Sequence, residues 1–241
     1  MKYGESFFIP ILWLFRKKGP EKRGCGVWLA GLLPALVTGL WSCDAVSGTG
    51  TGRMADAAEI KALFIATWNV QALFDGEENG KEYTEYRMTA GWSEEKYRAR
   101  LTALADAAVR MTEGGPDILA LQEVENETVL KSLAEGPLAK YGYTRTLFAN
   151  NPGASLGVGL LSRLPFLETK THSVTCNGVT SPRPVAEVRM ELGKTPVVLF
   201  ICHWKSKVEG EDATEDARRA SARVVLRRLR EIWAEEPDLP V

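Results

Sequence analysis

The sequence predicts an α/β domain in which packed β-sheets are covered on the outside by helices. Three apolar runs rich in β-branched and aromatic residues, at 61–69, 117–124 and 197–204, have the character of buried strands. Two longer segments, at about 94–111 and 213–234, repeat apolar residues at helical spacing. Strands outnumber helices in this pattern, and 241 residues suffice for one sizeable core. We therefore expect sheets packed together under helices.

Shorter strands and a further helix complete the prediction. Residues 157–163, 172–176 and 185–191 are strand candidates, and a short helix is expected after Asn126. In the last of these strands we expect inward and outward residues to alternate. The inward set is Val185, Val188 and Met190, and the outward set is Ala186 and Arg189.

The two long helices have recognisable boundaries. Ser93 is a suitable N-cap, with Glu94 and Glu95 in the first turn, and Gly114, Gly115 and Pro116 end the first helix. The second helix ends before Pro237. The apolar face expected on the first helix consists of Tyr97, Leu101, Leu104, Ala108 and Met111.

The N-terminal segment has the order of an export leader, and we assign residues 1–43 to it. Basic residues at 16–23 precede an apolar run at 27–41, and "LWSC" then resembles the lipobox of bacterial lipoproteins, which makes Cys43 the expected lipidation site. An ordinary secretory leader and an uncleaved anchor are the alternatives. Residues 44–60 are expected to form a flexible tether, and residues 61–241 the domain. The predicted location is the cell membrane or outer membrane, or else secreted or periplasmic.

Charge and cysteine usage exclude some classes of protein. Residues 1–42 hold six of the 30 basic and two of the 31 acidic residues, so the rest of the chain is mildly acidic and does not suit general nucleic-acid binding. No cysteine or histidine spacing is typical of a zinc site. Cys176 and Cys202 are expected as free thiols, with a disulfide between them as the alternative.

Polar residues interrupt three buried-looking runs at their ends. They are Asn69, Glu123 and His203, and each side chain can bind a metal or a phosphate oxygen. Taken singly, each has an ordinary explanation as a strand-end carboxylate, a turn residue or a hydrogen-bonded histidine. Their combination favours a shared site, because the ends of adjacent strands converge.

Five segments together resemble one known superfamily. They are "TWNVQALFD", "PDILALQEVEN", "LGVGLLSRLPF", "SPRPVAEVR" and "HWKSK" followed by "TEDARR". Their order and spacing resemble the deoxyribonuclease-I-like endonuclease/exonuclease/phosphatase superfamily over residues 61–241. The resemblance implies a four-layer α/β sandwich, two sheets face to face with helices outside, and Mg²⁺-dependent hydrolysis of phosphate esters.

The resemblance also implies a role for each polar residue. Glu123 matches a glutamate that ligates the divalent cation, and Asn69 matches the asparagine beside it, which orients a metal-bound water or the phosphate. His203 matches a histidine that binds the scissile phosphate, and Arg183 an arginine that reaches it. The implied cofactor is Mg²⁺, with Mn²⁺ or Ca²⁺ as alternatives.

The expected partners are a phosphate-ester substrate and, through the N-terminal anchor, a membrane. The substrate class stays open between nucleic acid, nucleotide and phospholipid headgroup. No obligate protein partner is expected. Lys205 faces either the phosphate or solvent, Lys207 is equally open, and Trp204 is expected to turn the other way and pack.

Two motifs of the superfamily pattern have no match in the sequence. They are a Gly-Asp-x-Asn motif after the second long helix and a Ser-Asp-His motif near the C-terminus. We therefore expect the domain to be incomplete at its C-terminal side, lacking the last strands. A non-catalytic truncated or split-gene fragment is one alternative to the enzyme. A glycosidase is another, with Glu123 and Glu125 about 7 Å apart on one strand face as its acid/base pair.

Overall fold

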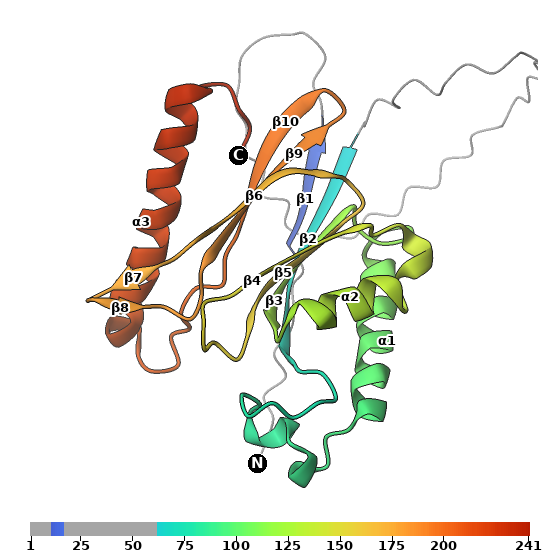
Figure 1. Ribbon diagram of the computed structural model, residues 1–241. Coiled ribbons are helices and arrows are strands. Elements are labelled where there is room, and N and C mark those ends of the chain that lie inside the picture. Colours follow the sequence, from blue (N-terminus) through green and yellow to red (C-terminus); the bar gives the residue numbers. More distant parts are fainter. Residues whose placement is uncertain (1–10, 17–61) are drawn as a thin grey trace, which may run out of the picture.

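The computed structural model describes residues 11–16 and 62–241, with backbone only for the first segment (Figure 1). Its helices are α1 (Glu94–Met111), α2 (Glu127–Glu135) and α3 (Glu211–Glu235), and short 3₁₀ turns lie at Thr84–Tyr86, Met88–Ala90 and Ala139–Tyr141. The strands are β1 (Ile11–Arg16), β2 (Ala62–Leu73), β3 (Ile118–Val124), β4 (Arg145–Ala149), β5 (Gly157–Ser162), β6 (Phe166–His172), β7 (Thr175–Cys176), β8 (Val179–Thr180), β9 (Val185–Leu192) and β10 (Thr195–Ile201).

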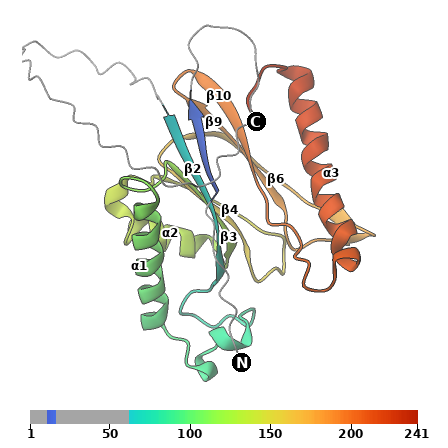
Figure 2. The same ribbon diagram turned by 180° about the vertical axis from the view of Figure 1, so that it is seen from behind.

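The elements form four layers, which confirms the predicted α/β sandwich. A five-stranded sheet has the order β1-β2-β3-β5-β4, and a three-stranded sheet has the order β10-β9-β6. Helices α1 and α2 cover the outer face of the first sheet, and α3 covers the outer face of the second (Figures 1 and 2). Strands β7 and β8 form a separate hairpin beside α3.

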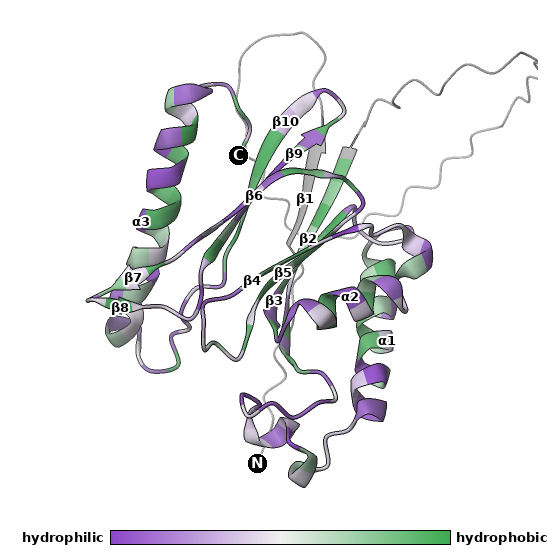
Figure 3. Cartoon of the chain, in the orientation of Figure 1, coloured by the Kyte–Doolittle hydropathy of each residue, from purple (hydrophilic) through white to green (hydrophobic). Residues whose placement is uncertain are grey.

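Strands β3 and β5 of the first sheet are buried on both faces, which explains their continuous apolar runs. In β3, Leu119 and Leu121 pack under α1 and α2, whereas Ile118 and Ala120 face the second sheet. Figure 3 shows the same distribution, with hydrophobic strands at the centre and hydrophilic residues along the helices. Gly159 of β5 permits close approach of α2, because a Cβ there would lie 2.5 Å from Leu130 Cδ2.

The expected alternation in β9 is wrong in one respect. Ala186, Val188 and Met190 share the face toward the first sheet, so Ala186 points inward and is buried. Val185 lies on the other face and packs with Ala220 of α3. The prediction failed because α3 covers the second face, so that both faces of β9 accept apolar residues.

A buried charge cluster ties α3 to the second sheet. Glu187 of β9 is only 5% exposed at its side chain and accepts hydrogen bonds from Arg228 Nε at 2.7 Å and Nη2 at 3.1 Å. His172 Nε2 lies 2.6 Å from the same carboxylate. Burial alone would raise the pKa of Glu187, but the hydrogen bonds from Arg228 and His172 bring this pKa below its ordinary value.

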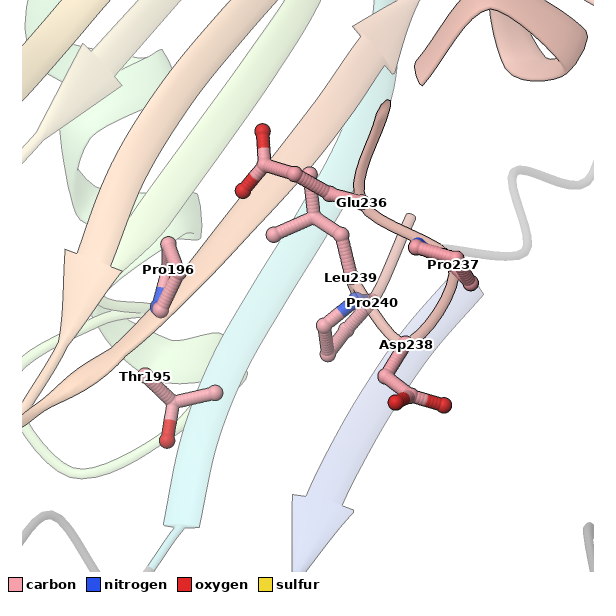
Figure 4. Close-up of a pocket in the computed structure, with 7 residues that line it drawn as sticks. All are labelled: Thr195, Pro196, Glu236, Pro237, Asp238, Leu239 and Pro240. Carbon is pink, nitrogen blue, oxygen red and sulfur yellow. The ribbon is translucent and has the colours of Figure 1, made fainter. Parts of the chain in front are cut away.

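The C-terminal segment lies along the edge of β10. Val198 N donates to Pro240 O at 3.0 Å, and Leu239 is buried beside Val198 and Ile232. Thr195, Pro196 and residues 236–240 line a hollow of about 250 Å³ there (Figure 4). This hollow lies at the end of β10 opposite to His203.

The helix caps agree with the sequence, whereas some strands were not predicted. Ser93 Oγ accepts from Lys96 N, and Asn126 Oδ1 accepts from Val129 N at 2.9 Å. Strand β4 and most of β6 were missed because few of their residues are fully buried, so neither segment has a buried-strand pattern. The predicted strand at 172–176 instead spans the last residue of β6 and the whole of β7.

The assignment of residues 1–43 to an export leader stays a prediction, and only residues 11–16 of this segment are described. Strand β1 pairs antiparallel with β2, from Ile11 opposite Thr67 to Arg16 opposite Ala62, within the segment assigned to the leader. The rest of the leader, including Cys43, and the tether lie outside the described residues. Within the described part of the chain, no helix combines the length and apolar character needed to cross a bilayer.

Both cysteines of the domain are free thiols. Cys176 and Cys202 are half-buried and pack against the cluster under α3. Burial raises the pKa of the Cys202 thiol, so this group is neutral near pH 7.

Candidate active site

The three polar residues predicted from the strand ends come together in the structure. Strands β2 and β3 run parallel, with Asn69 opposite Gln122, so Asn69 and Glu123 lie at the same edge of the first sheet. His203 follows β10 of the second sheet by two residues, and its Nε2 lies 3.5 Å from Glu123 Oε1. The site therefore sits where the two sheets meet at their strand ends.

An irregular backbone places Glu123. Between the pairs Asn69/Gln122 and Leu73/Val124, residues 70–72 of β2 stand opposite the single residue Glu123 of β3. Gln71, Ala72 and Glu123 all have positive φ angles, of 56°, 54° and 66°. A non-glycine residue in this conformation costs roughly 1–3 kcal/mol, and such residues concentrate at functional sites. We call residues 70–72 the β2 bulge.

Both oxygens of the Glu123 carboxylate accept hydrogen bonds. Asn69 Nδ2 donates to Oε1 at 2.8 Å, and the backbone N–H of Ala72 donates to Oε2 at 3.0 Å. Asn69 is itself oriented, because its Oδ1 accepts from Gln71 N at 2.9 Å. Both donors come from β2, so the bulge presents the carboxylate in one orientation.

His203 is neutral near pH 7. Its side chain is 17% exposed, and burial lowers its pKa to about 4, with the nearby positive charge of Arg183 acting in the same direction. Glu123 opposes this shift only partly. A neutral imidazole keeps one N–H donor and one acceptor, so His203 can still donate a hydrogen bond to a phosphate oxygen.

We expect the metal-free protein to lose stability on acidification because His203 must take up a proton. The pKa of about 4 in the folded chain lies below the ordinary 6.5, so between these values the unfolded chain binds the proton preferentially. The free energy of unfolding should therefore fall by about 3 kcal/mol from pH 6.5 to pH 4 through this group. Urea titrations in chelator measure this change. Between pH 6.5 and pH 4, the free energy of unfolding should fall by about 3 kcal/mol less in His203→Gln than in the parent protein. An equal fall in both proteins would contradict the assignment.

Arg183 reaches the same strand ends from the loop before β9. Its backbone N–H donates to Ser181 Oγ at 3.1 Å, and its guanidinium Nη1 donates to Trp204 O at 2.8 Å. The side chain is half-buried, and its charge acts on the pKa of His203. Its guanidinium thus lies beside the candidate site with further donors available.

The lysines and the tryptophan after His203 are more exposed. Lys205 and Lys207 form ion pairs with Glu209 and Glu211, four residues further along the chain. The phosphate-facing role of Lys205 stays a prediction. Trp204 is 44% exposed, so the expectation that it packs away from the site is wrong. The reason is that β10 ends at Ile201, and Trp204 lies in the following loop.

Tyr83 lies near the candidate site, and the sequence did not indicate this. Burial raises the pKa of its phenol, Glu123 raises it further, and Arg183 lowers it, so the ring lies within electrostatic reach of both. It packs edge-on against Phe74, with ring centroids 5.2 Å apart, and is partly exposed. A lone tyrosine in a polar loop has no pattern that would identify it.

The donor set fits a hydrated Mg²⁺ ion. Among residues 62–241, no group of three or more histidine, cysteine or acidic side chains is arranged to hold a metal. Mg²⁺ does not need such a cage, because it keeps several waters and binds through one or two carboxylates plus substrate phosphate. The Glu123 carboxylate and the Asn69 amide oxygen supply hard oxygen donors of this kind.

The acid/base pair of the glycosidase alternative is not formed. Glu125 is 5% exposed, and its oxygens accept from Asp75 N and Asn79 Nδ2, both at 2.8 Å. Burial raises the pKa of this carboxyl. Glu125 therefore holds the loop after β2, and only Glu123 is placed at the site.

Comparisons with solved structures find partial matches to this chain. TDP2 from Caenorhabditis elegans matches with a TM-score of 0.49 and 20% identity, over 73% of this chain and 44% of that one. An endonuclease/exonuclease/phosphatase family protein from Leptotrichia buccalis matches with a TM-score of 0.45 and 16% identity, over 68% and 60%. The human Nocturnin catalytic domain with bound sulfate matches with a TM-score of 0.46 and 17% identity, over 70% and 59%.

These comparisons also set the length of the chain against its relatives. The chain spans 44% to 60% of the length of the three solved structures named above. A comparison with curated protein sequences finds no match. A family model described as "Endonuclease/Exonuclease/phosphatase family" matches residues 64–241. Because this match covers most of the sequence, the chain belongs to the endonuclease/exonuclease/phosphatase family.

Proposed function

We propose that this chain carries the metal- and phosphate-binding part of a Mg²⁺-dependent phosphoesterase. The observation that carries the proposal is the oriented carboxylate of Glu123 beside neutral His203 and within reach of Arg183. Family membership supports a hydrolase of the phosphoesterase or nuclease kind. We include Mn²⁺ and Ca²⁺ as alternative ions.

Each residue has a role that its contacts support. Glu123 would hold the ion, with Asn69 fixing the carboxylate and offering its amide oxygen. Bound Mg²⁺ supplies Lewis-acid stabilisation of charge on the phosphoryl oxygens. The Arg183 guanidinium binds a non-bridging oxygen, and the N–H of neutral His203 donates a hydrogen bond to the phosphate as negative charge builds up.

Metal dependence tests the proposal directly. The full natural chain should hydrolyse bis(p-nitrophenyl) phosphate or p-nitrophenyl phosphate with Mg²⁺, and the diester-to-monoester ratio indicates which ester class it prefers. Excess chelator should reduce the rate to background, because the Lewis acid contributes several kcal/mol. Added Mg²⁺ should restore the rate. A rate that chelator leaves unchanged would overturn the proposal.

We also propose export and membrane attachment through Cys43, on the order of basic and apolar segments in the sequence. Metabolic labelling with radioactive palmitate in a bacterial host should mark the chain. Cys43→Ser should abolish the label, and a label that persists in this variant would contradict the assignment.

A further inference from the structure

Arg100 of α1 reaches the β2 bulge with both ends of its guanidinium. Its Nη2 donates to Val70 O at 2.8 Å and also to Gln71 O, and its Nη1 donates to Ala72 O at 3.1 Å. Tyr86 Oη accepts from Nη1 at 3.0 Å and itself donates to Gln71 O at 3.2 Å. All three carbonyls of the bulge therefore accept from a single side chain.

The bulge needs such support because its backbone lies outside the regular β2–β3 ladder and is strained. No residue of β3 is registered opposite residues 70–72 except Glu123, so their groups leave the regular ladder. Gln71 and Ala72 have positive φ angles, which only a well-determined surrounding structure maintains. The guanidinium of an arginine has five N–H donors in a fixed plane, so it can donate to three neighbouring carbonyls at once. The ammonium of a lysine carries its donors on a single nitrogen and cannot span them in the same way.

The placement of Arg100 is specific to the bulge. Helix α1 otherwise meets the sheet through apolar residues, namely Tyr97, Leu101, Ala105 and Ala108. Within residues 62–241, Arg100 forms no ion pair with a carboxylate, so its donors serve backbone carbonyls and the Tyr86 phenol. Its guanidinium also lies over the Tyr86 ring, 5.4 Å from the centroid.

We infer that Arg100, steadied by Tyr86, is a positioning residue that holds the β2 bulge in the shape that presents Glu123 to the metal. The link is the Ala72 N–H, which lies in the bulge and donates to Glu123 Oε2. We call the hydrogen bonds from Arg100 to the three bulge carbonyls the Arg100 clamp. Loss of the clamp would release the Ala72 N–H and let the Glu123 carboxylate turn. The inference rests on the proposed metal role of Glu123, and it adds a helix residue that touches neither metal nor phosphate.

Mn²⁺ binding to the full chain, measured by electron paramagnetic resonance, tests the clamp without substrate. Arg100→Lys keeps the positive charge but removes the planar guanidinium that contacts several carbonyls at once. We expect the Mn²⁺ affinity to fall about tenfold or more, as it does when other residues that orient a metal ligand are replaced. The matched control is Arg98→Lys on the same helix, because Arg98 is exposed and its guanidinium pairs only with Glu94. This control should bind Mn²⁺ as the parent does.

Amide hydrogen exchange gives a second readout that a general loss of stability would not reproduce. In Arg100→Lys the Ala72 amide should exchange about tenfold faster, while core amides such as that of Leu119 keep their rates. Parent-like Mn²⁺ affinity and Ala72 exchange in this variant, with binding lost in Glu123→Gln, would overturn the clamp and leave the proposed function intact. Mn²⁺ binding that survives Glu123→Gln would overturn the metal site itself, and the clamp with it.

Discussion

Glu123→Gln should abolish the Mg²⁺-dependent hydrolysis of a simple phosphodiester by the full protein while leaving the fold intact. The substitution removes the negative charge that would hold the cation and keeps the size of the side chain. If the ion contributes several kcal/mol of charge stabilisation, the rate should fall by about a thousandfold. Initial rates on bis(p-nitrophenyl) phosphate at saturating Mg²⁺ measure this loss.

The fold should tolerate this change. The amide oxygen that the substitution introduces can still accept from Asn69 Nδ2, and the one contact at risk is the bond from Ala72 N. Its loss should cost about 1 kcal/mol, so the melting temperature should shift by only a few degrees. Glu127→Gln is the matched control, because Glu127 lies on the exposed surface of α2 and pairs only with Lys131. Activity retained in Glu123→Gln would remove Glu123 from the site.

Arg228→Met should be the most damaging change to stability outside the apolar core. It leaves the carboxylate of Glu187 buried, 5% exposed, with His172 as its remaining partner. Breaking a buried pair from one side typically costs 3–5 kcal/mol, and we expect about 3 kcal/mol here because His172 still contacts Glu187. Urea unfolding followed by far-ultraviolet circular dichroism measures the change.

Two further variants separate the buried charge from the loss of the side chain. Arg227→Met removes the exposed neighbour, whose contact with Glu231 is 3.8 Å long, and should change stability by less than about 0.5 kcal/mol. Arg228→Met combined with Glu187→Leu removes both charges and should recover most of the loss. A double variant as unstable as Arg228→Met would mean that packing of the arginine stem, not the unpaired carboxylate, dominates.

The layers of the fold could be predicted from the sequence, because strands buried on both faces have continuous apolar runs. Strand β3, with Ile118, Leu119, Ala120 and Leu121, is the clearest example. Strand β6 was not predicted, since its residues alternate only weakly and several are exposed. The inward face of β9 was assigned wrongly because nothing in its own sequence reports the presence of α3 above it.

The residues of the candidate site could be predicted from the sequence, whereas their geometry could not. Asn69, Glu123 and His203 are chemically distinct residues at the ends of apolar runs, so their type and position predict a meeting point. Glu123 adopts a positive φ and accepts from Ala72 N, which is 51 positions away in the sequence. Arg100 donates to Ala72 O from 28 positions away. No local pattern encodes such contacts, because each side chain acts through a backbone brought close only by the fold.

Anomalous diffraction from Mn²⁺ can show whether Glu123 ligates the catalytic ion. Crystals of the full natural chain, soaked with Mn²⁺, should show an anomalous peak in direct contact with a carboxylate oxygen of Glu123, on the side of His203 and Arg183. The peak should be missing from Glu123→Gln crystals soaked in the same way. A peak at another site of the domain, with none beside Glu123, would show that Glu123 is not the metal ligand.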